Sequence, residues 1–280
     1  MDSSIFKIFK YKPSLITVLL FCLLLAGACD FREHSKLSQI LEAGNKAFAA
    51  KQFDEAIRQY DRGLAIRPTE AVFLMNKSSA LLQRGIDRYN KSIQSTDPPQ
   101  VKAAEKEGAG KDFHDAQVYA TAALEQFDSP DFWMIISNPN LERDKLSVYG
   151  SKAESLRLIA SVIDKNRAIE ARVAIYEYVK REKDKDKKTK AQLGCGKMLL
   201  ETSNGNHAIA EYRSVLNDNP DNIEGVLGVG LSLSQSGDKK QFKEAVIYLE
   251  RFVKEAPDQH PLKASVKESL DYLKQESTAQ

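Results

Sequence analysis

Histidine and cysteine are the side chains of this sequence best suited to bind a metal ion or carry out catalysis. The four histidines are His34, His114, His207 and His260. They are scattered, and none has a second histidine, a cysteine or an acidic residue at metal-ligand spacing. The sequence therefore predicts no zinc site and favours surface or turn positions for these residues.

Two glycine-containing stretches could form phosphate-binding loops, but neither fits the required pattern. The stretch GVLGVG at 225–230 lies inside a predicted helix, whereas a dinucleotide-binding loop follows a strand and opens a helix. The stretch GCGKM at 194–198 lacks the Ser or Thr that must follow the lysine. The sequence also has no Gly-x-Ser-x-Gly nucleophile elbow. We expect no catalytic residue, no cofactor and no enzymatic activity.

The charge balance argues against nucleic acid as a partner. Lys and Arg total 41 and Asp and Glu total 39, a net charge of +2 at pH 7. Residues 1–28 hold three lysines and one aspartate, so the chain without them has a net charge near zero. Nucleic-acid-binding proteins usually carry a basic excess, which this composition does not provide.

The first 28 residues have the composition of an export signal. Lys7, Lys10 and Lys12 precede an uncharged apolar run at 14–28, which is typical of a secretory signal peptide. The end of this run, LLLAGAC, resembles the lipobox of bacterial lipoproteins, although alanine stands where that family prefers leucine. The resemblance implies that Cys29 is lipidated and becomes the N-terminus.

Two other interpretations of this segment stay open. One is a plain signal peptide cleaved near Ala28. The other is an uncleaved N-terminal membrane anchor, although a spanning helix needs about 20 residues and the apolar run is shorter. We expect an exported protein, held at the periplasmic face of the cell envelope by acyl chains on Cys29. Residues 29–36 would form a short tether to the folded part.

Helices are the elements that would position any binding residues, and their pattern repeats along the chain. In the stretch 52–68, Phe53, Ala56 and Tyr60 recur at three- and four-residue steps, which define one face of a helix. Pro68 ends this helix, because proline cannot continue the backbone hydrogen-bond ladder. The segment upstream has the same periodicity, so two short helices are expected to form a pair.

A fixed spacing of small residues recurs downstream. Ala56 follows Gly44 by twelve residues, and Ala208 follows Gly196 by the same step. The same step of twelve residues separates three alanines from a following proline: Ala56 from Pro68, Ala208 from Pro220, and Ala245 from Pro257. No segment alternates between polar and apolar residues over a useful length. This order resembles the tetratricopeptide repeat, a helix–turn–helix unit of about 34 residues, and the resemblance implies an all-α solenoid.

The resemblance divides residues 37–276 into successive helix pairs. The clearest units are 37–70, 189–222 and 223–259, the last with three residues added around 238–241. Weaker units are 71–128, with an insertion at 86–110, and 141–180, followed by a charged linker or helix end at 180–190. Residues 261–275 form an amphipathic segment that fits a terminal capping helix. We expect an all-α, tetratricopeptide-like solenoid of four to five helix pairs plus a C-terminal capping helix, with a long hairpin at 71–127.

In the family that the chain resembles, the first helix of each pair lines a concave groove that receives a peptide or a partner helix. The resemblance places these residues near that surface: Asn45, Phe48, Met75, Asn76, Ser79, Lys190, Lys197, Leu227 and Leu231. Core packing is an alternative explanation for Phe48, Met75 and Leu227. Some members hold a terminal carboxylate with basic residues, but Leu41, Val72 and Met75 stand at those positions. We therefore expect an extended or helical partner, held by apolar and amide contacts.

An apolar cluster between two predicted pairs is a second candidate surface. It contains Phe132, Trp133 and Met134, and Trp133 is the single tryptophan of the chain. One interpretation is a hydrophobic plug under the long hairpin. The other is an exposed patch for a partner, since apolar clusters of this size often mark interaction sites.

These observations predict a non-enzymatic scaffold that holds other proteins at a membrane surface. Tetratricopeptide lipoproteins serve as assembly factors in cell-envelope machines, and the resemblance implies that role here. The alternative is a cell-wall glycan-binding or enzyme-accessory module of the envelope. The sequence leaves the partner and the oligomeric state open.

Overall fold

The computed structural model describes residues 33–130, 138–235 and 238–278. Within those ranges all regular secondary structure is helical and no residue lies in a β-strand, which confirms the predicted all-α class. The helices in chain order are residues 33–49, α2 (Phe53–Ile66), α3 (Ala71–Gln94), α4 (Pro99–Asp128), α6 (Leu141–Val162), the short 3-10 helix η1 (Lys165–Arg167), α7 (Ala168–Arg181), α8 (Lys185–Glu201), α9 (Gly205–Asp218), α10 (Ile223–Ser234), α11 (Lys239–Glu255) and α12 (Lys263–Thr278).

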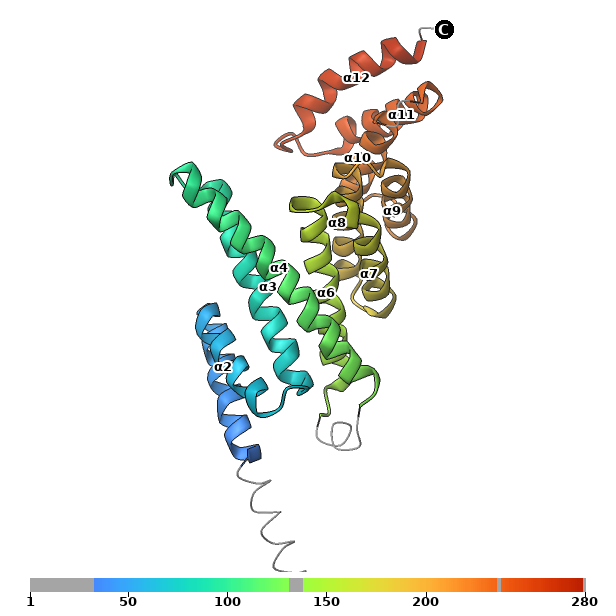
Figure 1. Cartoon of the computed structure of the whole chain (residues 1–280). Helices are drawn as coiled ribbons and strands as arrows, with labels where there is room; N and C mark the ends of the chain where they lie inside the picture. The colour runs from blue at the N-terminus through green and yellow to red at the C-terminus, as the bar shows by residue number, and fades with distance from the viewer. Residues whose placement is uncertain (1–32, 131–137, 236–237, 279–280) are drawn as a thin grey trace, which may run out of the picture.

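Consecutive helices form pairs that stack into a solenoid (Figure 1). The pairs are 33–49 with α2, α3 with α4, α6 with α7, α8 with α9, and α10 with α11. Helix α12 packs on α11 and closes the C-terminal end of the stack. The architecture therefore agrees with the predicted helix pairs and capping helix.

Small residues let the two helices of a pair approach closely. A Cβ atom on Gly196 would lie 2.8 Å from the ring of Tyr212, which is too close for two carbon atoms. Gly44 stands against the ring of Tyr60 in the same way. The alanines twelve residues after these glycines, Ala208 and Ala56, are fully buried, and so is Ala245 of the last unit. The regular spacing in the sequence is thus the signature of a tyrosine ring packed on a glycine.

The second pair is longer than its neighbours. Helix α3 has 24 residues and α4 has 30, against 14 in α2. The distal parts of α3 and α4 project beyond the neighbouring pairs as a long hairpin (Figure 1). Pro98 is the N-cap of α4 and Pro99 is its first residue, a position that proline tolerates because its missing N–H needs no partner there.

The hairpin revises the predicted insertion at 86–110. The second helix of this pair was expected to begin near Lys111, but α4 begins at Pro99. Residues 86–94 continue α3. The periodicity through Tyr89 and Ile93 predicts this extension of α3, whereas the helical state of residues 99–110 in α4 was not expected.

The predicted tether and linker are also partly helical. Residues 33–36, assigned to the tether, belong to the first helix. Within the charged run 180–190, only 182–184 connect two helices. The side chain of Asp184 accepts the backbone N–H groups of two residues in the first turn of α8. This cap satisfies donors that a helix start leaves unpaired, so α8 begins inside the lysine-rich run.

The added residues of the last unit lie mostly in a helix. Asp238 is the N-cap of α11, and its carboxylate accepts the backbone N–H of Lys240. The spacing had suggested that the added residues lengthen the turn before α11. Residues 239–241 instead form the first turn of α11.

The turns inside the first and fourth pairs have the same geometry. Lys51 has φ 58° and Ser203 has φ 63°, both in the left-handed region. In each turn the next residue donates its N–H to the carbonyl five positions back, from Gln52 to Ala47 and from Asn204 to Leu199. This pattern is a Schellman motif, which ends a helix and satisfies its last carbonyl groups.

Candidate functional site

Two asparagines predicted for the groove meet across adjacent first helices. Asn76 Nδ2 on α3 donates to Asn45 Oδ1 on the first helix at 3.0 Å. The hydroxyl of Tyr60 on α2 donates to the same oxygen at 3.0 Å. Burial raises the pKa of Tyr60 to about 12, so its hydroxyl stays protonated near neutral pH and remains a donor. Three helices thus fix the orientation of Asn45.

This arrangement leaves one donor and one acceptor available. Both donors found at Asn45 go to its oxygen, and its own amide N–H groups have no partner among the residues described. The side-chain oxygen of Asn76 is likewise without a recorded hydrogen bond in the described part of the chain. Asn45 is exposed and Asn76 is half-buried. An N–H donor beside a carbonyl acceptor is the complement of one peptide group.

The other predicted groove residues divide into exposed and packed ones. Lys190 and Lys197 on α8 are exposed, and the Nζ of Lys197 lies 3.9 Å from a carboxylate oxygen of Glu201. Ser79 uses its hydroxyl to donate to the carbonyl of Met75.

The apolar members mostly contribute to the core. Phe48, Met75 and Leu231 are half-buried and pack against core clusters. Leu227 is only 3% exposed, so its side chain has almost no surface for a partner. For Leu227 the core-packing explanation describes the structure, because α10 carries apolar residues on more than one face.

A pocket that the sequence did not suggest lies where the first pair meets the long hairpin. Its volume is about 580 Å³. The lining residues come from the first turn and from α2, α3 and α4: Lys51, Gln52, Phe53, Asp54, Glu55, Arg58, Arg84, Asp87, Arg88, Lys91 and Glu105. Two further pockets lie beside the 66–71 turn and on the distal part of α4. None of these three pockets is lined by a predicted groove residue.

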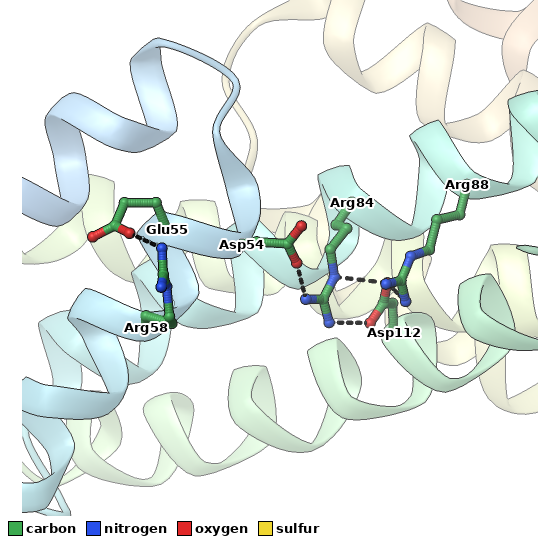
Figure 2. Close-up of polar contacts among 6 residues, drawn as sticks. All are labelled: Asp54, Glu55, Arg58, Arg84, Arg88 and Asp112. Atoms are coloured by element: carbon green, nitrogen blue, oxygen red, sulfur yellow. Dashed lines mark hydrogen bonds and ion pairs between the residues drawn. The ribbon is translucent and has the colours of Figure 1, made fainter.

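Three residues that line this pocket, Asp54, Arg84 and Arg88, belong to an ion cluster with Asp112 (Figure 2). Asp112 on α4 is 1% exposed. It accepts Arg84 Nε at 3.0 Å and Arg84 Nη2 at 2.5 Å, and Arg88 Nη1 at 3.0 Å. Arg84 Nη1 also donates to Asp54 of α2 at 2.6 Å. Three helices are therefore joined by one network, with Arg84 at its centre.

The electrostatics of this cluster favour the charged forms. Burial opposes the charge of Arg84, but the hydrogen bonds to Asp112 and Asp54 outweigh it and raise the pKa of Arg84. Each guanidinium of the cluster thus has a carboxylate partner. Such a set of paired charges positions helices and offers no nucleophile. Its sequence signal was Arg84 and Arg88 one turn apart, but 29% of the chain is charged and the pair does not stand out.

The described residues hold no group of three or more His, Cys, Asp or Glu side chains arranged for a metal ion. Cys195 is 1% exposed, and burial raises the pKa of its thiol to about 12. The thiolate, which is the reactive form, is therefore scarce at neutral pH.

Several predicted features lie outside the described residues. They are the signal peptide at 1–28, the lipidation site Cys29 and the apolar patch Phe132, Trp133 and Met134. Among the helices that are described, none combines the length and apolar character needed to cross a membrane.

The stacked helix pairs define the class of fold: the chain is a tetratricopeptide-like solenoid. The structure of YrrB, described as a TPR protein with an unusual peptide-binding site, matches with a TM-score of 0.50 and 14% sequence identity, over 82% of this chain and 90% of that chain. The P58(IPK) TPR domain matches with a TM-score of 0.39 and 13% identity, over 96% and 72% of the two chains. The TPR2AB domain of yeast Sti1, in a complex with pHSP90, matches with a TM-score of 0.33 and 18% identity, over 88% and 99%. No protein-family model and no curated protein sequence matches the chain.

Proposed function

We propose that this protein is a non-enzymatic scaffold that binds a peptide or helix of a partner protein on the face formed by its first helices. The amide pair of Asn45 and Asn76 is the observation that carries this proposal. Tyr60 holds the Asn45 oxygen in place, so a donor and an acceptor are presented in a fixed orientation. Groups held in the bound geometry before binding lose less conformational entropy when the partner arrives.

The likeness in fold supports a peptide as the class of partner. YrrB, which shares the architecture, is described as having a peptide-binding site. The present chain adds Lys197, exposed on α8, further along the same set of first helices. A partner segment that reaches from Asn45 to α8 would meet amide groups first and a lysine later.

We further propose that the protein is exported and anchored at the bacterial cell envelope through lipid on Cys29. The support is the basic head, the apolar run and the small residues before Cys29. Mass spectrometry of the N-terminal peptide tests this directly. A diacyl or triacyl mass on Cys29 is the expected result, and an intact 1–28 segment would contradict it.

Photo-crosslinking in cells tests the binding face. A crosslinking amino acid at Asn45, Asn76 or Lys197 is expected to capture the same one or two envelope proteins. The same probe at Arg62 or Ala210, exposed on second helices, serves as the control and should not capture them. Recovery of glycan fragments instead of proteins would support the cell-wall alternative and contradict the proposal.

A substitution series then assigns the contact to the amide pair. Asn76→Ala removes the available acceptor and the N–H group that holds Asn45, and we expect roughly tenfold weaker binding of the captured partner, since one hydrogen bond contributes about that much. Asn206→Ala, on the exposed side of α9, is the matched control. Equal affinity of the two variants would contradict a role for the amide pair.

A further inference from the structure

The connection between α7 and α8 carries a concentrated positive charge. Residues 180–190 contain seven Lys or Arg and three Asp or Glu, a net charge of +4, whereas the whole chain has +2. The lysines are Lys180, Lys183, Lys185, Lys187, Lys188 and Lys190. Five of them are exposed and Lys188 is half-buried.

Two of the three acidic residues in this segment are engaged by the backbone. Glu182 is 7% exposed and accepts the N–H groups of Lys183 and Asp184 and the hydroxyl of Tyr178, at 2.8–3.0 Å. Asp184 caps α8 through its own side chain. The fold thus turns two carboxylates toward backbone N–H groups while the lysines face solvent.

The six lysines of this run form no ion pair with any residue in the described ranges, although Lys180 and Lys187 lie near enough to Glu177 and Glu182 to lower the pKa of those carboxyls. The neighbouring acidic groups have other partners: Asp128 at the end of α4 pairs with Lys145 at 2.6 Å, and Asp144 on α6 accepts from Asn138 at 2.9 Å. Arg181, which lies within the run, pairs with Glu177.

Contacts along one edge of the solenoid connect this run to the start of the described chain. Glu33 pairs with Arg67 at 2.7 Å. A pocket lined by Arg67 and Ser129 joins that turn to the end of α4, and Figure 1 shows the first helix beginning on the same side of the molecule as the α4–α6 junction. The ion pair between Asp128 and Lys145 joins the end of α4 to α6. Tyr149 lies four residues after Lys145 on α6.

The last step along this edge reaches the basic run itself. The guanidinium of Arg181 lies 4.1 Å from the ring centroid of Tyr149. Cys29 is four residues before Glu33, and four residues span at most about 14 Å. A lipid on Cys29 would therefore hold this edge close to the bilayer.

We propose that the basic run at 180–190 docks on anionic phospholipid headgroups and orients the anchored solenoid with this edge against the membrane. Exposed lysines that form no ion pair are attracted to an anionic surface within a Debye length. The choice of lipid over an acidic protein rests on the proposed anchor at Cys29, whereas the charge and geometry of the run are independent of it. The long hairpin extends from this edge toward the other side of the solenoid, away from the bilayer.

Lysine footprinting on the reconstituted full chain tests the proposal. The protein is placed in vesicles of phosphatidylcholine alone or with roughly one-quarter phosphatidylglycerol, and acetylation of each lysine is followed by mass spectrometry. We expect acetylation of Lys183, Lys185 and Lys187 to fall about fivefold in the anionic vesicles and to recover in about 0.5 M salt. Lys106 on the hairpin and Lys243 on α11 are the internal controls, and their acetylation should not change.

A variant with matched control makes the result specific. In K183Q/K185Q/K187Q/K188Q, the remaining Lys180 and Lys190 should lose their protection. The control K106Q/K240Q/K243Q/K254Q removes the same charge from other exposed positions and should retain it. Equal acetylation of 180–190 in both kinds of vesicle overturns the proposal. Protection by added poly-L-glutamate in neutral vesicles, without protection by anionic lipid, overturns it in favour of an acidic protein partner.

The outcome can be separated from the fate of the anchor. Absence of an acyl mass on the Cys29 peptide contradicts the proposed anchoring. If the run is still protected by anionic vesicles in that case, the lipid-docking inference holds without the anchor. An acylated chain whose lysines react equally in both vesicles retains the anchor and loses the docking inference.

Discussion

The long hairpin and the C-terminal helix pairs differ in what fills the space between their helices. Around α8 and α9 the buried side chains are mostly apolar, with Leu199, Tyr212 and Cys195 in one cluster, and the buried polar residue Gln192 is uncharged. Between α3 and α4 the buried set also includes Asp112 and Lys77. The α8–α9 region is therefore stabilised mainly by apolar packing, with ion pairs such as Arg172–Glu211 at its margin, whereas the α3–α4 region also buries the charged side chains of two ion pairs.

Several polar contacts of the hairpin connect different helices. Lys77 pairs with Asp61 of α2 and donates to the hydroxyl of Tyr119 of α4 at 2.6 Å. Ser78 donates to the carbonyl of Ala116 at 2.8 Å. Apolar contact is non-directional, whereas hydrogen bonds need defined distances and angles. The comparison teaches that a long, projecting hairpin needs directional contacts at its base to fix its angle.

The substitution Asp112→Ala should have the largest effect on this comparison. It leaves Arg84 and Arg88 without their buried partner, and loss of one member of a buried ion pair costs about 3–5 kcal/mol in the free energy of unfolding. Urea denaturation followed by circular dichroism measures it. A loss below about 1 kcal/mol would show that the cluster is not a stabilising element.

Overpacking of the apolar region should have the second-largest effect on the free energy of unfolding. Ala208→Trp should lower the free energy of unfolding by about 1–3 kcal/mol or more, because a fully buried alanine has no room for an indole. Ala56→Trp makes the same change in the first pair. If both variants keep the melting temperature of the parent protein, the packing of the repeats is not as described.

Glu182 lies at the junction of α7 and α8 and gives a pH-dependent prediction. Its pKa is held below the usual 4.5, chiefly by the hydrogen bond from the N–H of Asp184 and also by the Tyr178 hydroxyl. A depressed folded-state pKa stabilises the fold above the unfolded pKa, and this contribution is lost as the pH falls through the folded value. Glu182→Gln should therefore cost about 1 kcal/mol near pH 7.

The pH dependence of that difference is the check. Melting curves of the Glu182→Gln variant and the parent protein should converge as the pH falls well below 4.5. A difference that stays constant from neutral to acid pH would mean that the carboxylate charge is not involved.

Glycine substitutions in the two Schellman turns should produce the smallest effect. Ser203→Gly and Lys51→Gly place glycine at a positive φ, which removes steric strain but adds freedom to the unfolded chain. We expect a net gain of about 0.5 kcal/mol for each. Differential scanning calorimetry should show equal upward shifts. A gain in one turn alone would show that the first and fourth pairs are not equivalent.

The sequence was sufficient to predict the parts of the fold in which small residues recur at the contact between paired helices. The recurring spacing of Gly44 and Gly196 marked corresponding positions in two repeats, and the structure places tyrosine rings against both. The segment 99–110 was not predicted as helix, because the adjacent prolines were interpreted only as an end of α3. It contains few large apolar residues, and its helical state goes with packing against α3.

The candidate site was less accessible to sequence reasoning than the fold. Asn45 and Asn76 were both predicted for the groove, but their mutual hydrogen bond depends on how two pairs stack. The ion cluster at Asp112 joins residues far apart in the chain. The lysines of 180–190 were visible as a charged run, but the inward turn of Glu182 was not.

The length of α3 has a mechanical consequence for the molecule. At about 1.5 Å per residue, α3 is roughly 36 Å long and α2 roughly 21 Å, so the hairpin overhangs its neighbour by about 15 Å. A force applied at the tip of the hairpin is therefore resisted by the contact between Arg84 and Asp112. A pull on the hairpin tip would thus exert a torque on the first pair through the Arg84–Asp54 contact.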